Sequence, residues 1–138
     1  GTAIMALQFS TSVRNAMLDA IETAIGTSAV LKIRSGSAPA NCGTADSGTV
    51  LATISLASDW AAAASSGSKA FNSLPVTDSS ADNTGTAAHY RLYASDGTTC
   101  HHQGTVGTTG TDMIVDSTSF TAGQTFNVTA WTWTAPGA

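Results

Sequence analysis

The chain has 138 residues, only 10% of them charged, and a formal net charge of −4. This length suits a single domain with its own hydrophobic core, while the charged share is well below the roughly one quarter usual in soluble proteins. The five basic residues stand singly along the chain, so no basic cluster is present to bind nucleic acid. The chain also lacks the run of about 18 apolar residues that marks a membrane span. We therefore expect neither nucleic acid nor a membrane as a partner.

The start of the chain and its two cysteines bear on its compartment. Gly1 to Ile4 precede Met5, and we expect these four residues to remain from cloning, with a single domain over residues 5–138. No charged segment followed by an apolar stretch stands near the start, so no secretion signal is expected. Cys42 and Cys100 are then expected to be free thiols, although an even cysteine count leaves a disulfide open.

Residues 11–25 carry apolar side chains at three- and four-residue spacing, which predicts an amphipathic helix. These positions are Val13, Ala16, Met17, Ala20, Ile21 and Ala24. Ser10 stands where an N-cap oxygen would accept a backbone N–H, and Gly26 where a left-handed residue would end the helix. Because so short a helix is marginal alone in water, we expect its apolar stripe to pack on the rest of the domain or on a neighbouring subunit.

The chain beyond this helix predicts short strands separated by polar turns. We expect strands at residues 30–34, 50–56, 70–74, 88–94, 100–106, 113–115 and 125–134. Asp96-Gly97 is a strong hairpin signal between two of them. The alternation of the last strand slips near Ala130, which predicts a bulge or a strand covered on both faces. The fold class is therefore mostly β, a single-domain β-sandwich or jelly-roll-like fold with one N-terminal amphipathic helix.

Several short patterns resemble catalytic or metal sites without completing one. Ser66 and Lys69 match S-x-x-K, but the companion motifs are absent. Cys100 and His102 would share one face of a regular strand and could bind a metal, yet no third ligand is apparent. The acidic run over residues 78–83 lacks the spacing of a calcium loop. We expect no catalytic residue, no cofactor and no metal.

Aromatic side chains are few, so most should be used in the core. Tyr90 lies on the apolar face of its strand and is expected there. Tyr93, Trp131 and Trp133 lie off the main apolar faces and suit a protein contact or a sugar-stacking surface. The candidate interface residues are Val13, Met17, Ile21, Tyr93, Trp131 and Trp133.

The sequence FSTSVRNAMLDAI over residues 9–21 resembles the opening of a group of small virion proteins of tailed bacteriophages. Residues 35–56 match the segment that follows in that group, and residues 82–93 and 100–111 also resemble it, so the likeness spans nearly the whole chain. The resemblance implies a capsid cement, or decoration, protein with a jelly-roll-like fold, located in the virion after assembly in the host cytoplasm. It implies no individual site residue.

Under this interpretation the protein is a non-enzymatic structural protein that forms a dimer or trimer and binds the major capsid protein or another virion protein. We expect its contacts to involve residues 5–25 and the strand over residues 125–134. The alternative is a tail or fibre-tip module that binds a host surface glycan, which exposed and coplanar Trp131 and Trp133 would favour. A small hydrolase would need a carboxylate pair or a His–Ser–Asp cluster in a cleft.

Overall fold

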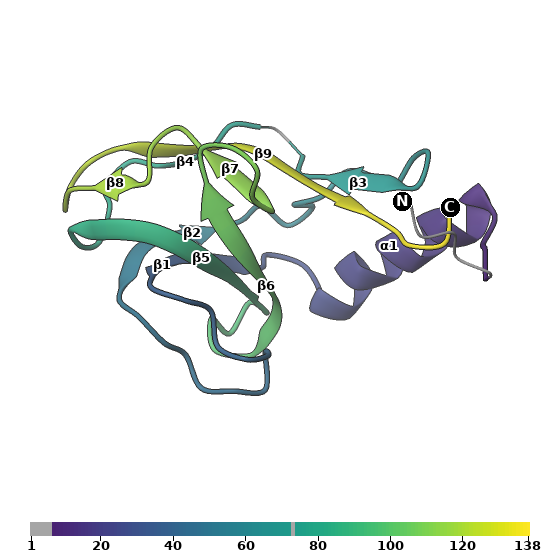
Figure 1. Ribbon diagram of the computed structural model, residues 1–138, viewed down its shortest axis with the longest axis horizontal. Helices are drawn as coiled ribbons and strands as arrows, with labels where there is room; N and C mark the ends of the chain where they lie inside the picture. The colour runs from purple at the N-terminus through teal and green to yellow at the C-terminus, as the bar shows by residue number, and fades with distance from the viewer. Residues whose placement is uncertain (1–6, 73) are drawn as a thin grey trace, which may run out of the picture.

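The computed structural model describes residues 7–72 and 74–138, so the expected cloning remnant and Met5 lie outside the described residues. Within this part the chain is mostly β with one helix near its N-terminus, as the sequence predicted (Figure 1). The helix is α1 (Thr11–Ile25). The strands are β1 (Val30–Ser35), β2 (Val50–Ser55), β3 (Ser68–Ala70), β4 (Val76–Asp78), β5 (Gly85–Tyr93), β6 (Cys100–Gly107), β7 (Met113–Val115), β8 (Ser119–Phe120) and β9 (Phe126–Thr134).

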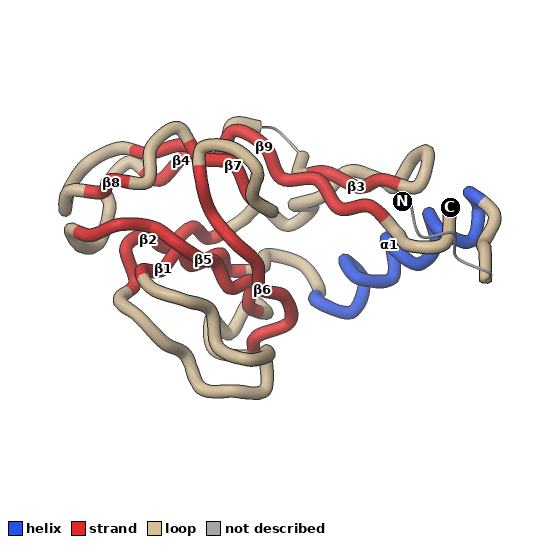
Figure 2. Tube along the Cα trace, viewed as in Figure 1, coloured by secondary structure: helices blue, strands red, loops and turns tan. Residues whose placement is uncertain are grey.

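The strands form one curled sheet of the sandwich type. Their order is β2-β1-β5-β6-β7-β9-β3, with β4 added to β9 and β8 added to β5. All these pairs are antiparallel except β6 with β7. β6 crosses from the layer of β1, β2 and β5 to the layer of β4, β7 and β9, so the two ends of the sheet face each other (Figures 1 and 2). This curl encloses the apolar face of both layers.

The core fills the space between the two layers. Leu31 and Ile33 of β1 and Leu92 of β5 are fully buried on one side. Met113 of β7 and Val128 of β9 are fully buried on the other side and belong to the same cluster. Strands whose side chains alternate between two faces place every second residue in such a core.

The two ends of α1 and a bulge in β9 lie where the sequence predicted them. The Ser10 hydroxyl accepts a hydrogen bond from the Val13 N–H at 3.2 Å, and Gly26 follows the helix with φ of +90°. In β9, Ile114 pairs with Ala130 and Val115 pairs with Val128, which leaves one extra residue between the two partners. The predicted bulge near Ala130 is therefore confirmed.

Three features of the strands differ from the sequence prediction. The strand expected over residues 70–74 lies at Ser68–Ala70, because its partner is the end of β9. β4 and β8 were not predicted; they have only three and two residues and are defined by pairing with β9 and β5. The loop over residues 36–48 covers the outer face of β5, so both faces of that strand are buried from His89 to Tyr93.

Candidate functional site

α1 extends from one end of the β body, beside β3 and the end of β9 (Figure 2). The side of α1 that is buried carries Arg14, Leu18 and Ile25. The Arg14 guanidinium is buried and donates to the Ala135 carbonyl at 3.0 Å, and the Asn15 side-chain oxygen accepts from the Gly67 N–H at 2.8 Å. A Cβ at Gly67, where φ is +75°, would stand 2.5 Å from the Arg14 guanidinium carbon. Only glycine therefore fits under this contact.

A buried lysine makes the second attachment of α1. Lys69 of β3 has a side chain only 1% exposed, and its ammonium lies 2.7 Å from Asp19 and 2.8 Å from Glu22. It also donates to the Ala62 carbonyl at 2.9 Å. Burial alone would lower the pKa of Lys69, but the hydrogen bonds to Asp19 and Glu22 outweigh it and raise that pKa. The ammonium is thus fixed in its charged form between two carboxylates of the helix.

The apolar stripe of α1 is left largely exposed by this arrangement. Val13 is 44% exposed and Met17 36% exposed. The three alanines of the stripe are exposed as well, and Ile21 is half-buried. Most of the stripe is therefore exposed, whereas Ile21 packs against the core of the domain. We call Val13, Ala16, Met17, Ala20 and Ala24 the apolar face of α1.

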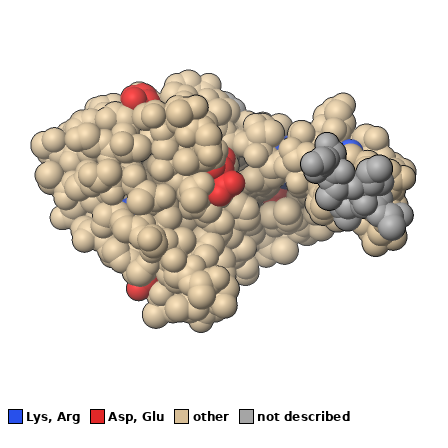
Figure 3. Space-filling model, viewed as in Figure 1, with Lys and Arg blue, Asp and Glu red and all other residues tan. Residues whose placement is uncertain are grey.

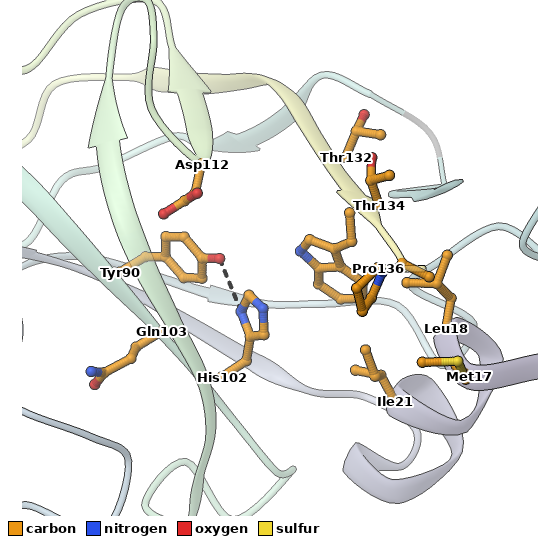
Figure 4. Close-up of a pocket in the computed structure, with 12 residues that line it drawn as sticks. Met17, Leu18, Ile21, Tyr90, His102, Gln103, Asp112, Thr132, Thr134 and Pro136 are labelled. Carbon is orange, nitrogen blue, oxygen red and sulfur yellow. Dashed lines mark hydrogen bonds between the residues drawn. The ribbon is translucent and has the colours of Figure 1, made fainter. Parts of the chain in front are cut away.

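A groove of about 560 Å³ separates α1 from β6 and the end of β9 (Figure 4). Met17, Leu18 and Ile21 form its apolar wall on the helix side. The remaining lining residues are Tyr90, His102, Gln103, Asp112, Thr132, Trp133, Thr134, Ala135 and Pro136. The groove thus joins an apolar wall to a small number of polar groups, a composition typical of binding sites.

A chain of hydrogen bonds forms the polar side of the groove. The Trp131 indole N–H donates to the Tyr90 hydroxyl at 3.0 Å, and that hydroxyl lies 2.9 Å from Nδ1 of His102 (Figure 4). Burial raises the pKa of Tyr90. Burial lowers the pKa of His102, and the negative charge of nearby Asp112 opposes this second shift in part. The Asp112 carboxylate accepts from the Thr105 N–H at 2.9 Å. Both Tyr90 and His102 are therefore neutral at pH 7.

The six candidate interface residues reach different places. Val13 lies on the apolar face of α1, while Met17, Ile21 and Trp133 line the groove. The expected exposure of Tyr93 and Trp131 is wrong. Both side chains are buried, because the loop over residues 36–48 covers Tyr93 and the aromatic cluster with Tyr90 encloses Trp131. The alternation of apolar and polar residues along a strand could not predict that a loop covers Tyr93 or that other aromatic rings enclose Trp131.

The arrangement that would favour a glycan platform is not present. The rings of Trp131 and Trp133 lie 5.0 Å apart but nearly perpendicular, at 86°, and Trp131 is 2% exposed. Sugar stacking needs an exposed ring face. Among the described residues that line the groove there is one carboxylate, Asp112, and no serine, so the groove does not bring together a carboxylate pair or a His–Ser–Asp cluster.

The other sequence patterns serve the fold. Lys69 of the S-x-x-K match binds α1, and Asp78 and Asp82 of the acidic run accept hydrogen bonds from Thr53 of β2. Tyr93 pairs with Cys100 and Leu92 with His102, so the two candidate metal ligands point to opposite faces. In the part of the chain that the structure describes, no three metal-ligating side chains gather as a metal site requires.

Comparisons of the chain with protein-family models, curated proteins and solved structures found no match. Across residues 7–72 and 74–138, no helix is long and apolar enough to cross a membrane.

Proposed function

We propose that the chain is a non-enzymatic structural protein of a tailed-bacteriophage virion that decorates the capsid lattice. The resemblance of residues 9–21 and 35–56 to small virion proteins supports the virion setting. The observation that carries the assembly role is the orientation of α1, which buries Arg14, Leu18 and Ile25 against the domain and leaves the apolar face of α1 exposed. The apolar face of α1 and the adjoining groove are the proposed contact with a neighbouring virion protein.

Hydrophobic burial supplies the driving force for such a contact. Covering the exposed parts of Val13 and Met17 would contribute about 1 kcal/mol each, as a fraction of the 1.5–3 kcal/mol for a fully buried side chain. A single contact of this kind is weak. A lattice of repeated copies engages many of them together, so overall binding exceeds that of one contact.

The charge distribution favours close contact with protein. All five basic side chains lie in the described residues, and Arg14, Arg34, Lys69 and Arg91 are buried. Few charged side chains are visible in the view of Figure 3, and they are mainly acidic; the groove itself is lined by one exposed carboxylate, Asp112. The cores of protein interfaces are depleted in charged residues, and a surface of this kind is easily desolvated. Self-association as a dimer or trimer and binding to the major capsid protein both belong to the proposal.

The location is tested by counting copies in purified phage particles, by quantitative mass spectrometry against the major capsid protein. Hundreds of copies per particle are expected for a protein of the capsid lattice. A handful of copies would instead place the protein in the tail and contradict a role on the capsid lattice. Absence from the particles would contradict a virion role altogether.

The contact surface is tested by Met17→Glu, which places a charge in the middle of the apolar face and the groove. We expect incorporation into particles to fall at least tenfold, since a buried unpaired carboxylate costs several kcal/mol, with unchanged helix content and Tm. Ser12→Glu adds the same charge on another side of α1 and should change incorporation less than twofold. Wild-type incorporation of Met17→Glu would show that α1 is not the contact.

A further inference from the structure

The turn around Cys42 is fixed over the outer face of β5. The Arg91 guanidinium donates from Nη2 to the carbonyls of Asn41 and Thr44, both at 2.9 Å. The Thr44 N–H donates to the Asn41 carbonyl at 3.0 Å and closes a turn with Cys42 at its corner. One buried side chain of the sheet thus holds both ends of the turn, so Cys42 has a defined place above the sheet.

A bulge in β6 brings Cys100 to the same face. Leu92 pairs with His102 and Tyr93 pairs with Cys100, so His101 is an extra residue in β6. Cys100 therefore points outward with Tyr93, toward the loop over residues 36–48, and not inward with His102. The hydroxyl of Tyr93 donates to Asp46 of that loop at 2.7 Å. The loop and Cys100 therefore occupy one surface.

Both cysteines lie where the loop over residues 36–48 covers β6, because Nε2 of Gln103 in β6 donates to the Pro39 carbonyl of the loop at 2.7 Å. Cys42 stands in the turn held by Arg91, and Cys100 pairs with Tyr93, which is two residues from Arg91 on the same face of β5. Both cysteines are free and partly exposed. A small oxidant can therefore reach them, and a bond between them would join the turn at Cys42 to the start of β6.

We propose that Cys42 and Cys100 form an intramolecular disulfide under oxidising conditions and remain thiols in a reducing cytoplasm. With oxidised glutathione as the small-molecule disulfide, one protein thiolate attacks and releases one glutathione. The second protein thiol then displaces the other glutathione. The protein loses two protons and two electrons, and the oxidant leaves as two thiols.

The crosslink would tie the loop over residues 36–48 to β6 and restrict the unfolded chain between residues 42 and 100. Burial and the neighbouring Cys42 raise the pKa of Cys100 to about 12. The thiol is thus protonated at pH 7, and exchange should be slow there and faster at pH 9. This inference concerns the isolated chain and does not depend on the proposed function.

The test starts from fully reduced protein incubated with oxidised glutathione at pH 9. We expect the intact mass to fall by two hydrogen atoms, thiol titration to fall from two groups to none, and the chain to remain monomeric on a non-reducing gel. The Tm should rise by on the order of 10 °C, reversed by dithiothreitol. Cys42→Ser and Cys100→Ser should each abolish the loss of mass and the reductant-sensitive rise in Tm.

Three results would overturn the proposal. The first is retention of both thiols after prolonged oxidation, the second is a disulfide-linked dimer, and the third is a stable adduct with glutathione on the wild-type chain. Each would show that Cys42 and Cys100 do not reach one another in the folded protein.

Discussion

Asp46 connects three buried side chains on the outer face of the sheet. Its carboxylate lies 2.6 Å from Nη1 of Arg91, 3.0 Å from Nη2 of Arg34 and 2.7 Å from the Tyr93 hydroxyl. Burial alone would raise the pKa of Asp46, but hydrogen bonds from Tyr93 and Arg91 and the charge of Arg34 lower it. The loop over residues 36–48 thus supplies the countercharge that allows two guanidinium groups to be buried.

Replacing this carboxylate by an amide should destabilise the whole fold. We expect Asp46→Asn to lower the free energy of unfolding by about 2 kcal/mol. Loss of a partner from a fully buried pair costs more, but the Asp46 side chain is 40% exposed and solvent moderates the effect. Urea denaturation followed by circular dichroism measures the change.

Asp59→Asn is the matched control, because Asp59 is exposed and lies outside this cluster. Its effect should stay within about 0.5 kcal/mol, as is usual for surface substitutions. If the two variants were equally stable, Asp46 would not be the residue that stabilises the buried cations.

At the level of elements, α1 shows which parts of the fold the sequence can predict. Its bounds, its Ser10 cap and its Gly26 end follow from local spacing and local hydrogen bonds, and the sequence predicted all three. The side by which it attaches was not predictable. Periodicity identifies the apolar side of a helix, whereas attachment here depends on Lys69 and Gly67, more than 40 residues away.

In the strands too, features that depend on neighbouring residues were predictable and features that depend on distant residues were not. The Asp-Gly turn between β5 and β6 and the bulge in β9 were predictable from neighbouring residues. β4 and β8 were not, since so short a strand exists only through its partner. The same holds for Tyr93, whose burial depends on a loop more than 40 residues earlier in the chain.

The attachment of α1 can be tested at Lys69. Lys69→Met keeps an unbranched side chain in the buried site but leaves Asp19 and Glu22 without their cation. We expect α1 to open locally, so amide hydrogen exchange over residues 18–25 should quicken at least tenfold, which corresponds to a loss of about 1.4 kcal/mol in local stability. Exchange in β1 and β5 should be unchanged.

Lys32→Met provides the comparison for this variant. Lys32 lies in β1 and is partly exposed, with its ammonium 5.1 Å from the centre of the Tyr93 ring. It should leave exchange in α1 at the wild-type rate. Equal exchange in α1 of the wild type and Lys69→Met would mean that Arg14 and the packing of Leu18 hold the helix without the ion pairs.

Across the whole molecule, the groove could be predicted only in part. Met17, Ile21 and Trp133 were selected from the sequence, and the fold brings them to one groove. The polar side of the groove, Tyr90 with His102, was missed. No spacing rule connects residues of α1, β5, β6 and β9 before the sheet curls, because their meeting depends on the crossing of β6.

The fold buries His89 and partly buries His102, and this determines how the stability of the molecule depends on pH. His89 is 1% exposed, donates from Nδ1 to the Gly36 carbonyl at 2.6 Å, and lies near Arg34 and Arg91. Burial lowers the pKa of His89, and the two arginines lower it further against the opposing hydrogen bond to Gly36. Burial likewise lowers the pKa of His102. Protonation would place a cation in the interior at His89 and in the partly desolvated wall of the groove at His102.

Stability should therefore fall as the solution is acidified below pH 6.5. Between the usual histidine pKa and the lower values in the folded protein, the unfolded chain binds more protons than the folded chain, so the free energy of unfolding rises with pH. We expect the free energy of unfolding to fall between pH 7.5 and pH 5, in a window above the one in which Asp46 titrates. His89→Asn, whose amide can still donate to Gly36, and His102→Gln should each flatten the slope. His101→Gln, at the exposed neighbour of His102, should leave the slope of stability against pH unchanged.

Thermal unfolding of the wild type and the three variants across this pH range measures these slopes. A wild-type Tm that stays constant from pH 7.5 to pH 5 would show that the unfolded chain gains no protons over the folded one, and that His89 and His102 can be charged within the fold.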